Sequence, residues 1–354
     1  MPSAAERWIA SLSPWPTDGF GLERMRALLA ALGDPQLEYP AIHVVGTNGK
    51  STATRTIEAL LLADGLTVGA TVSPHVSGWA ERIRVNGEEA DFDEAIARVR
   101  PDAERLGATQ FEALTAAALA RFAVARVDVA VVEAGLGGRL DATNVLRTTV
   151  VLLTNVGLEH TDVLGETTEE IAREKLAVAH RDSIVVMVDN EHAHLVPGRR
   201  VVLGGAREAA ESFVGHGIET EVEVELPGRL ERRPGEIRDG AHNLEGVEWL
   251  LERLPPGDYT VCASILRDKN AAEMVARLSE TGTRFVATTS SNARALAAPA
   301  LAAIAEPLFA RVEVVEDPVD AVRRAHSLGE PVLVTGSLYL LADLAASERD
   351  GAVA

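Results

Sequence analysis

Residues 46–52 read Gly-Thr-Asn-Gly-Lys-Ser-Thr and follow an apolar run at 41–45. The apolar spacing of 52–64 predicts a helix directly afterwards, so the glycines lie in a turn between a strand and a helix. Backbone N–H groups, a helix N-terminus and a lysine ammonium at such a turn form a cradle for phosphate. We therefore predict a phosphate-binding loop. A plain strand-to-helix turn is the alternative, because Val44 stands where the full motif has glycine.

The composition narrows the possible partners. The chain has 354 residues, which is enough for two domains, and 47% of them are hydrophobic. Its net charge of -19 is spread along the sequence, which argues against nucleic acid as a partner but leaves room for a local phosphate site. Cys262 is the only cysteine, so an intramolecular disulfide and a cysteine-rich metal site are excluded.

No segment of the sequence has the pattern of a signal peptide or a membrane span. The first residues lack a charged stretch followed by an apolar one. No apolar run approaches the roughly 18 residues that span a bilayer. We expect a cytoplasmic protein that does not contact a membrane.

Short β-branched runs alternate with longer helical patterns along the whole chain, which predicts parallel βαβ units and an α/β fold. The predicted strands are 41–45, 67–72, 127–133, 148–154, 259–265, 284–289, 312–315 and 331–335. The predicted helices are 22–32, 52–64, 91–105, 111–125, 243–254, 270–281, 298–305, 318–327 and 338–346. Two Pro-Gly pairs flank a charged stretch at 227–235, so we place a linker between two domains there.

Two polar residues stand where predicted strands end. Glu133 closes the strand at 127–133, and His160 lies shortly after the strand at 148–154. Parallel sheets place ligands beyond the carboxyl ends of their strands, so an acid beside a phosphate loop is a natural Mg²⁺ ligand. Taken alone, Glu133 could equally be a surface acid, and His160 and Lys175 could be a structural histidine and a solvated lysine.

These stretches together resemble the folylpolyglutamate synthase/dihydrofolate synthase family of the Mur ligase superfamily. The similarity runs in order over nearly the whole chain. Its most specific stretches are Ser-Pro-His at 73–75 and the Glu-Ala-Gly-Leu-Gly-Gly-Arg-Leu-Asp-Ala-Thr-Asn run at 133–144. Other matching stretches are Glu-Lys at 174–175, Pro-Gly-Arg at 227–229 and Asp-Gly-Ala-His-Asn at 239–243.

The resemblance implies a fold and a division of the chain. It implies an N-terminal P-loop ATPase domain of the Mur-ligase type with a mostly parallel sheet, which binds ATP and folate and spans residues 1–226. The linker at 227–235 follows. A smaller Rossmann-like ligase domain spans residues 236–354.

The resemblance also implies roles for individual residues. Lys50, Lys175 and His160 are the implied catalytic residues, and Lys175 falls where the family has a lysine carbamylated by CO₂. The implied nucleotide contacts are Thr47, Asn48, Gly49, Lys50, Ser51, Thr52, Arg229, Asp239 and His242. The implied Mg²⁺ ligands are Ser51, Ser73, Glu133 and His160. The implied pterin-side pocket is formed by Phe111, Glu112, Thr115, Leu140 and Asp141.

The implied reaction is ATP-dependent ligation of L-glutamate to dihydropteroate or a reduced folate by a monomer.

The sequence departs from the family in three places. Lys50 is followed directly by Ser51, which leaves open whether Ser51 or Thr52 meets the metal. Glu159 stands where aspartate is usual. A helix between residues 175 and 227 that contacts ATP in the family is missing. Another Mur-type amide ligase, a P-loop kinase or ATPase, and a non-catalytic paralogue that binds nucleotide or folate remain alternatives.

Overall fold

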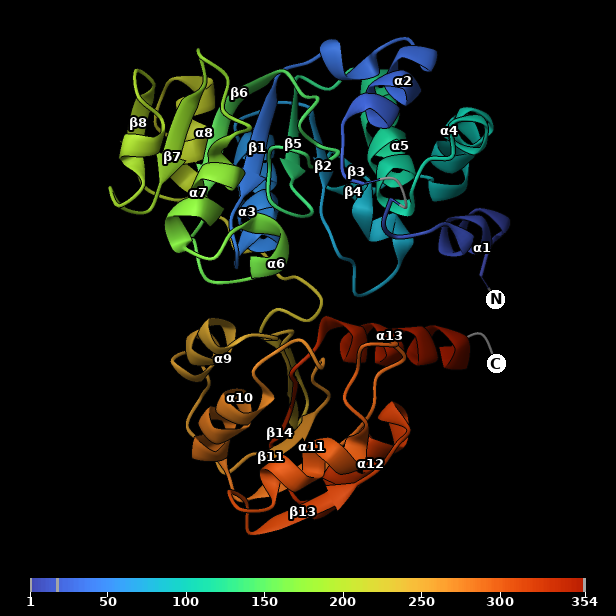
Figure 1. Ribbon diagram of the computed structural model, residues 1–354, viewed down its shortest axis with the longest axis vertical. Coiled ribbons are helices and arrows are strands. Elements are labelled where there is room, and N and C mark those ends of the chain that lie inside the picture. The colour runs from blue at the N-terminus through green and yellow to red at the C-terminus, as the bar shows by residue number, and fades with distance from the viewer. Residues whose placement is uncertain (1, 17–18, 353–354) are drawn as a thin grey trace. The chain divides into compact units, whose positions relative to one another are not determined.

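The computed structural model describes residues 2–16 and 19–352, which form two compact units (Figure 1). The first unit contains the chain up to His75 together with Trp79–Val224, and the second contains Val76–Gly78 together with the chain from Glu225. Residues 227–235, the predicted linker, lie in the second unit and include a short strand. None of the described helices is long and apolar enough to cross a membrane.

The first unit contains an eight-stranded sheet in the order β4-β3-β2-β5-β1-β6-β7-β8. Its neighbours are parallel except for the pairs β2–β3 and β3–β4. The strands are β1 Ala41–Val45, β2 Val68–Thr71, β3 Arg84–Val85, β4 Glu88–Glu89, β5 Val129–Glu133, β6 Thr148–Leu153, β7 Ile184–Met187 and β8 Arg200–Leu203.

Helices cover both faces of this sheet (Figure 1). They are α1 Ala4–Ser11, α2 Glu23–Ala31, α3 Lys50–Ala63, α4 Phe92–Leu106, α5 Gln110–Ala125, α6 Thr161–Leu164, α7 Thr168–Leu176 and α8 Ala206–Val214, with short 3₁₀ turns at Pro35–Leu37, Trp79–Arg82 and Ala193–Leu195. Alternation along β1 assigns its side chains to the two faces, because successive strand residues point to opposite sides. Ile42 and Val44 pack with α3 and α8, whereas Ala41 packs with the helices of the other face.

The register of the sheet brings three strand ends together. Val44 of β1 lies opposite Glu133 of β5, and Val45 of β1 lies opposite Leu153 of β6. The segments that follow these parallel strands therefore leave the sheet at the same edge. That edge carries residues 46–49, Glu133 and residues 154–160.

The second unit has a six-stranded sheet in the order β13-β12-β11-β14-β10-β9, parallel except for the pair β9–β10. Its strands are β9 Glu231–Arg233, β10 Glu236–Arg238, β11 Thr260–Ala263, β12 Arg284–Ala287, β13 Arg311–Val314 and β14 Val332–Thr335. Its helices are α9 Leu244–Leu251, α10 Ala271–Leu278, α11 Ala298–Ala305, α12 Pro318–Leu328 and α13 Leu338–Ala352, with a 3₁₀ turn at Ser279–Thr281. Val261 and Ala263 of β11 pack with α9, α10 and α11, and Cys262 between them packs with α12 and α13.

The predicted α/β class with mostly parallel sheets is confirmed. All eight predicted strands are present, each shortened or shifted by a few residues at most. The predicted helix at 52–64 begins two residues earlier, at Lys50, because Gly49 takes a left-handed φ of 78° and forms its N-cap. No predicted element corresponds to strands β3, β4, β7, β8, β9 and β10 or to helices α1, α6, α7 and α8.

Candidate active site

The turn at residues 46–49 connects β1 to α3 as the sequence predicts. Gly46 and Gly49 both have positive φ angles, 149° and 78°, which L side chains rarely adopt. No side chain caps the N-terminus of the fourteen-residue helix α3. Its first N–H groups therefore carry the partial positive charge that favours an anion.

Residues that follow β6 clamp this turn. The Asn155 side-chain oxygen accepts a hydrogen bond from the backbone N–H of Asn48 at 2.8 Å, and the Thr154 hydroxyl donates to the carbonyl of Asn48 at 2.7 Å. A Cβ on Gly46 would lie 1.9 Å from the Thr154 hydroxyl oxygen, so only glycine fits there. The Thr47 hydroxyl accepts from Gly157 N–H at 3.0 Å. Sequence reasoning missed Thr154 and Asn155, although they directly follow the strand next to β1.

Lys50 supplies a positive charge to the turn. Its ammonium donates to the carbonyls of Gly46 and Thr47, each at 3.0 Å. Both acceptors are uncharged, so a phosphate oxygen at the turn would be a stronger partner for this ammonium. The geometry agrees with the predicted role in phosphate binding.

Glu133 connects two of the predicted metal ligands. One carboxylate oxygen accepts from the Ser51 hydroxyl at 3.1 Å, and the other accepts from the backbone N–H of Ser73 at 3.0 Å. Ser51 is buried and Thr52 is exposed, which favours Ser51 over Thr52 as the metal-facing hydroxyl.

The donor set around Glu133 fits Mg²⁺. No group of three or more His, Cys, Asp or Glu side chains among residues 2–16 and 19–352 is placed to hold a metal. Mg²⁺ prefers oxygen and commonly takes only one or two carboxylates, with water and substrate phosphate as its remaining ligands. Glu133 and the Ser51 hydroxyl beside the phosphate turn match that requirement.

Lys175 is almost completely buried, at 1% exposed, and pairs with a carboxylate. Its ammonium donates to Glu159 at 2.8 Å and to the carbonyl of Gly46 at 2.8 Å. Burial alone would raise the pKa of Glu159, but the ammonium groups of Lys175 and Lys50 outweigh burial and lower that pKa to about 2. Burial lowers the pKa of Lys175, against the attraction of Glu159. His160 follows Glu159 with a left-handed φ of 45° and precedes α6.

The predicted pterin-side residues take different positions. Phe111 packs against the glycine segment after β5, because a Cβ on Gly135 would lie 2.6 Å from its ring. Glu112 caps α5 through the N–H and hydroxyl of Thr109 and accepts from Arg24 at 2.8 Å. Thr115 is buried in the same helix.

Leu140 and Asp141 differ in exposure. Leu140 is 44% exposed, whereas Asp141 is buried within its own loop. Backbone N–H groups of Gly135, Leu136 and Thr143 all donate to the Asp141 carboxylate, at 2.8–3.0 Å. Burial raises the pKa of Asp141 and these hydrogen bonds oppose the rise.

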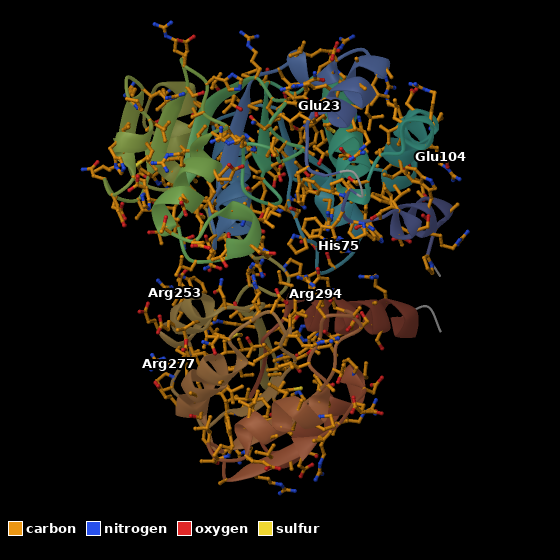
Figure 2. All side chains as sticks on the ribbon, viewed as in Figure 1. Glu23, His75, Glu104, Arg253, Arg277 and Arg294 are labelled. Carbon is orange, nitrogen blue, oxygen red and sulfur yellow. The ribbon has the colours of Figure 1, made fainter. Side chains whose placement is uncertain are left out.

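The histidine of the Ser-Pro-His motif, His75, which Figure 2 labels, lies against an aromatic ring at a tilt of 52°. The ring centroids of His75 and Trp79 are 4.4 Å apart, and Arg82 donates to His75 Nδ1 at 2.9 Å. The motif thus places a polar and aromatic cluster two residues beyond Ser73.

Three predicted nucleotide contacts lie close together within the second unit. The Asp239 carboxylate accepts from the backbone N–H groups of Leu230 and Ala241, at 2.7 and 2.8 Å. Burial raises the pKa of Asp239, and the hydrogen bond from Leu230 N–H and the charge of Arg229 oppose this rise. The His242 ring contacts the carbonyl of Gly240 at 2.8 Å.

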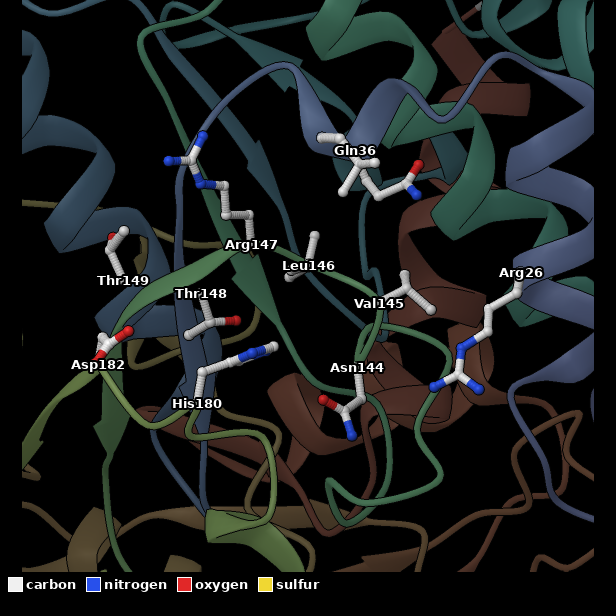
Figure 3. Close-up of a pocket in the computed structure, with 11 residues that line it drawn as sticks. Arg26, Gln36, Asn144, Val145, Leu146, Arg147, Thr148, Thr149, His180 and Asp182 are labelled. Atoms are coloured by element: carbon white, nitrogen blue, oxygen red, sulfur yellow. The ribbon is translucent and has the colours of Figure 1, made fainter. Parts of the chain in front are cut away.

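A hollow of about 620 Å³ lies in the first unit near the amino end of β6 (Figure 3). Arg26, Arg147 and His180 are among its lining residues, and all three are exposed. The phosphate turn follows the carboxyl end of β1, so this hollow belongs to the opposite edge of the sheet.

Comparisons with known proteins identify the family of the chain. A model of the Mur ligase middle domain matches residues 44–223. The dihydrofolate synthase/folylpolyglutamate synthase of Bacillus subtilis is 31% identical over 411 residues, covering 92% of this chain and 94% of that protein. That alignment is longer than the 354-residue chain, so the relative carries segments that this chain lacks.

Two solved structures extend the likeness to three dimensions. Escherichia coli FolC in complex with DHPP and ADP has a TM-score of 0.85 and 27% identity, with 100% of each chain covered. A bifunctional folylpolyglutamate synthase/dihydrofolate synthase with Mn, AMPPNP and L-glutamate bound has a TM-score of 0.84 and 28% identity, with 98% of each chain covered. The family resemblance predicted from the sequence is confirmed, and the chain belongs to the dihydrofolate synthase/folylpolyglutamate synthase family of the Mur ligases.

Proposed function

We propose that this protein is an ATP-dependent ligase that joins L-glutamate to the carboxylate of a pteroate or folate. The observation that carries the proposal is the contact of Ser51 with Glu133 beside Lys50 at the phosphate turn, in a chain of this family. The relatives' names and ligands supply the substrate classes: ADP or AMPPNP, L-glutamate and DHPP.

The reaction has two displacement steps. A carboxylate oxygen of the acid attacks the γ-phosphorus of ATP, ADP leaves, and an acyl phosphate forms. The amine of L-glutamate then attacks the acyl carbon, phosphate leaves, and the nitrogen loses a proton. The protein's contribution is positioning and charge neutralisation rather than covalent chemistry.

Individual residues of the first unit take these tasks. The turn amides and Lys50 hold the phosphates and offset the charge that develops on them. Ser51, Glu133, Ser73 and His160 are the proposed ligands of Mg²⁺, which when bound neutralises charge on the phosphate oxygens. The exposed Leu140 and the ring of Phe111 offer an apolar surface for a flat heterocycle.

Two further assignments remain predictions of the same proposal. Lys175 acts as a carbamate, and because CO₂ adds to the neutral amine, its ammonium must first lose a proton and leave Glu159. Arg229, Asp239 and His242 are the remaining proposed nucleotide-binding residues. We propose the ATP- and folate-binding domain at 1–226, the linker at 227–235, the ligase domain at 236–354, and a monomeric assembly, which light scattering would test.

The decisive experiment is ADP release by the purified protein with Mg²⁺-ATP, L-glutamate, and either dihydropteroate or tetrahydrofolate. We expect release only when the acid and the amino acid are both present. Release without an amine would indicate a kinase or ATPase. Release with a UDP-linked acid and none with pteroates would move the protein to another Mur branch. No release with any acid, together with measurable nucleotide binding, would indicate a non-catalytic protein.

A further inference from the structure

A buried histidine in β1 is linked to Asp141 through a threonine. His43 is 0% exposed, and its Nε2 lies 2.8 Å from the hydroxyl of Thr143. The same hydroxyl makes a short contact with the Asp141 carboxylate. The three side chains form one buried row, and none of the predicted site roles accounts for His43 or Thr143.

Donor and acceptor roles in this row are fixed by counting hydrogens. Three backbone N–H groups already donate to the Asp141 carboxylate, which acts as an acceptor throughout. Thr143 has a single hydroxyl hydrogen and gives it to Asp141. Its oxygen must therefore accept from His43, so the proton of the neutral imidazole is on Nε2.

A histidine at position 43 lowers the stability of the folded protein. Its Nδ1 is buried with no hydrogen-bond partner among the described residues. Burial, and to a smaller degree His180, lower the pKa of His43 to about 3, so the ring stays neutral and cannot gain an ion pair. An unpaired buried acceptor destabilises a fold, and a branched apolar residue would avoid it. The hydrogen bond from Nε2 to Thr143 is the favourable interaction that the ring makes against this loss of stability.

Beyond Asp141 the row reaches the glycine segment after β5. The second carboxylate oxygen of Asp141 accepts from the N–H groups of Gly135, at 3.0 Å, and Leu136, at 2.8 Å. Gly135 in turn lies against Phe111 so closely that no Cβ fits between them. A continuous set of contacts thus runs from the middle of the sheet to the ring of Phe111.

We propose that His43 and Thr143 are positioning residues that act through Asp141 to hold the 135–136 backbone and the ring of Phe111 in place for the acid substrate. Asp141 then holds the loop, and its contact with the pterin stays a prediction of the family resemblance. The effect on binding of the acid substrate rests on the proposed function. The effect on the backbone at residues 135–136 does not depend on that function.

The test compares Thr143→Val with Thr143→Ser. Valine keeps the shape of threonine and removes the hydroxyl, and serine keeps the hydroxyl. We expect Thr143→Val to raise the KM for the pteroate or folate about tenfold while the KM for ATP changes by less than about twofold. Thr143→Ser should remain near wild type in both. An equal rise in both KM values, no rise in either, or a serine variant as impaired as the valine variant would overturn the proposal.

A second measurement separates this inference from the proposed function. Amide hydrogen exchange at Gly135 and Leu136 needs no substrate. We expect exchange at these two amides to speed up about tenfold or more in Thr143→Val and to stay unchanged in Thr143→Ser. His43→Phe should have the same effect as the valine variant if it folds. Unchanged exchange in Thr143→Val would refute the positioning role even if the enzyme assay succeeds. If the protein lacks ligase activity and exchange is still faster in Thr143→Val, the positioning role of His43 and Thr143 would be supported and only the proposed function would be refuted.

Discussion

Lys50 is placed to act on phosphate and has little part in holding the fold. Among the residues that the structure describes, its ammonium donates to two loop carbonyls only. We predict that Lys50→Ala loses about 3 kcal/mol or more of transition-state stabilisation, a fall of at least about a hundredfold in ADP release. Thermal unfolding should hardly change. Arg323→Ala, which removes an exposed positive charge, is the matched control and should keep full activity. Near-normal turnover in Lys50→Ala would remove this residue from the site.

The ion pair of Lys175 and Glu159 predicts a pH-dependent stability. The pKa of Glu159 falls from 4.5 to about 2 in the folded protein, so its contribution is complete above pH 4.5 and is lost as the pH falls towards 2. Lysine is protonated throughout this acid window. We predict that Glu159→Gln, measured without CO₂ or bicarbonate so that Lys175 stays an ammonium, is less stable at pH 7 by an amount on the order of 3 kcal/mol.

Urea unfolding of both proteins between pH 7 and pH 3 checks this prediction. The gap between wild type and Glu159→Gln should narrow as the pH falls below 4.5. Glu159→Gln combined with Lys175→Met should regain part of the loss, because it no longer buries an unpaired ammonium. A gap that is constant with pH would show that the carboxylate charge of Glu159 does not stabilise the fold.

At the scale of elements, the phosphate turn depends on Gly46. A methyl group there would meet the Thr154 hydroxyl at 1.9 Å, and φ is 149°. We predict that Gly46→Ala displaces the turn from the residues after β6 and reduces ADP release at least about tenfold. Gly65→Ala is the control, since Gly65 has a positive φ of 91° but nothing within 4 Å of its Cβ. It should lose only about 1–2 kcal/mol of stability and keep its activity. Equal activity in Gly46→Ala and Gly65→Ala would show that the contacts of the turn with the residues after β6 are not needed for activity.

The elements that the sequence predicts well are those with a strong apolar pattern. The runs at 41–45 and 284–289 became β1 and β12, because buried parallel strands consist almost wholly of such residues. Strands β7 and β8 were not predicted, although their runs, Ile-Val-Val-Met and Arg-Val-Val-Leu, are at least as apolar as that of the predicted β13. The two-residue strands β3 and β4 are too short to leave a periodic signal.

Site residues that belong to a sequence motif could be predicted, whereas residues that reach the site only through tertiary packing could not. Glu133, Ser51 and Lys50 were all found in this way, and the structure places them around one turn. The partners Thr154 and Asn155 have no motif of their own, and their contacts depend on the register of β1 with β6. Thr109 and Glu112 match the capping-box spacing, which was not recognised in the sequence, and the structure uses both at the start of α5.

At the scale of the whole molecule, nucleotide binding should appear as a gain in stability. A ligand that binds only the folded protein adds about 2.7 kcal/mol when its concentration is one hundred times its Kd. For a unit of roughly two hundred residues this corresponds to a rise in Tm of about 5–10 °C. We predict this rise with Mg²⁺ and ATP together, and a much smaller one with ATP in EDTA, because Glu133 and Ser51 need the cation to approach the phosphates. Lys50→Ala should reduce the rise and Arg323→Ala should not. If the rise in Tm is the same without Mg²⁺ and in Lys50→Ala, the nucleotide binds somewhere other than the turn at residues 46–49.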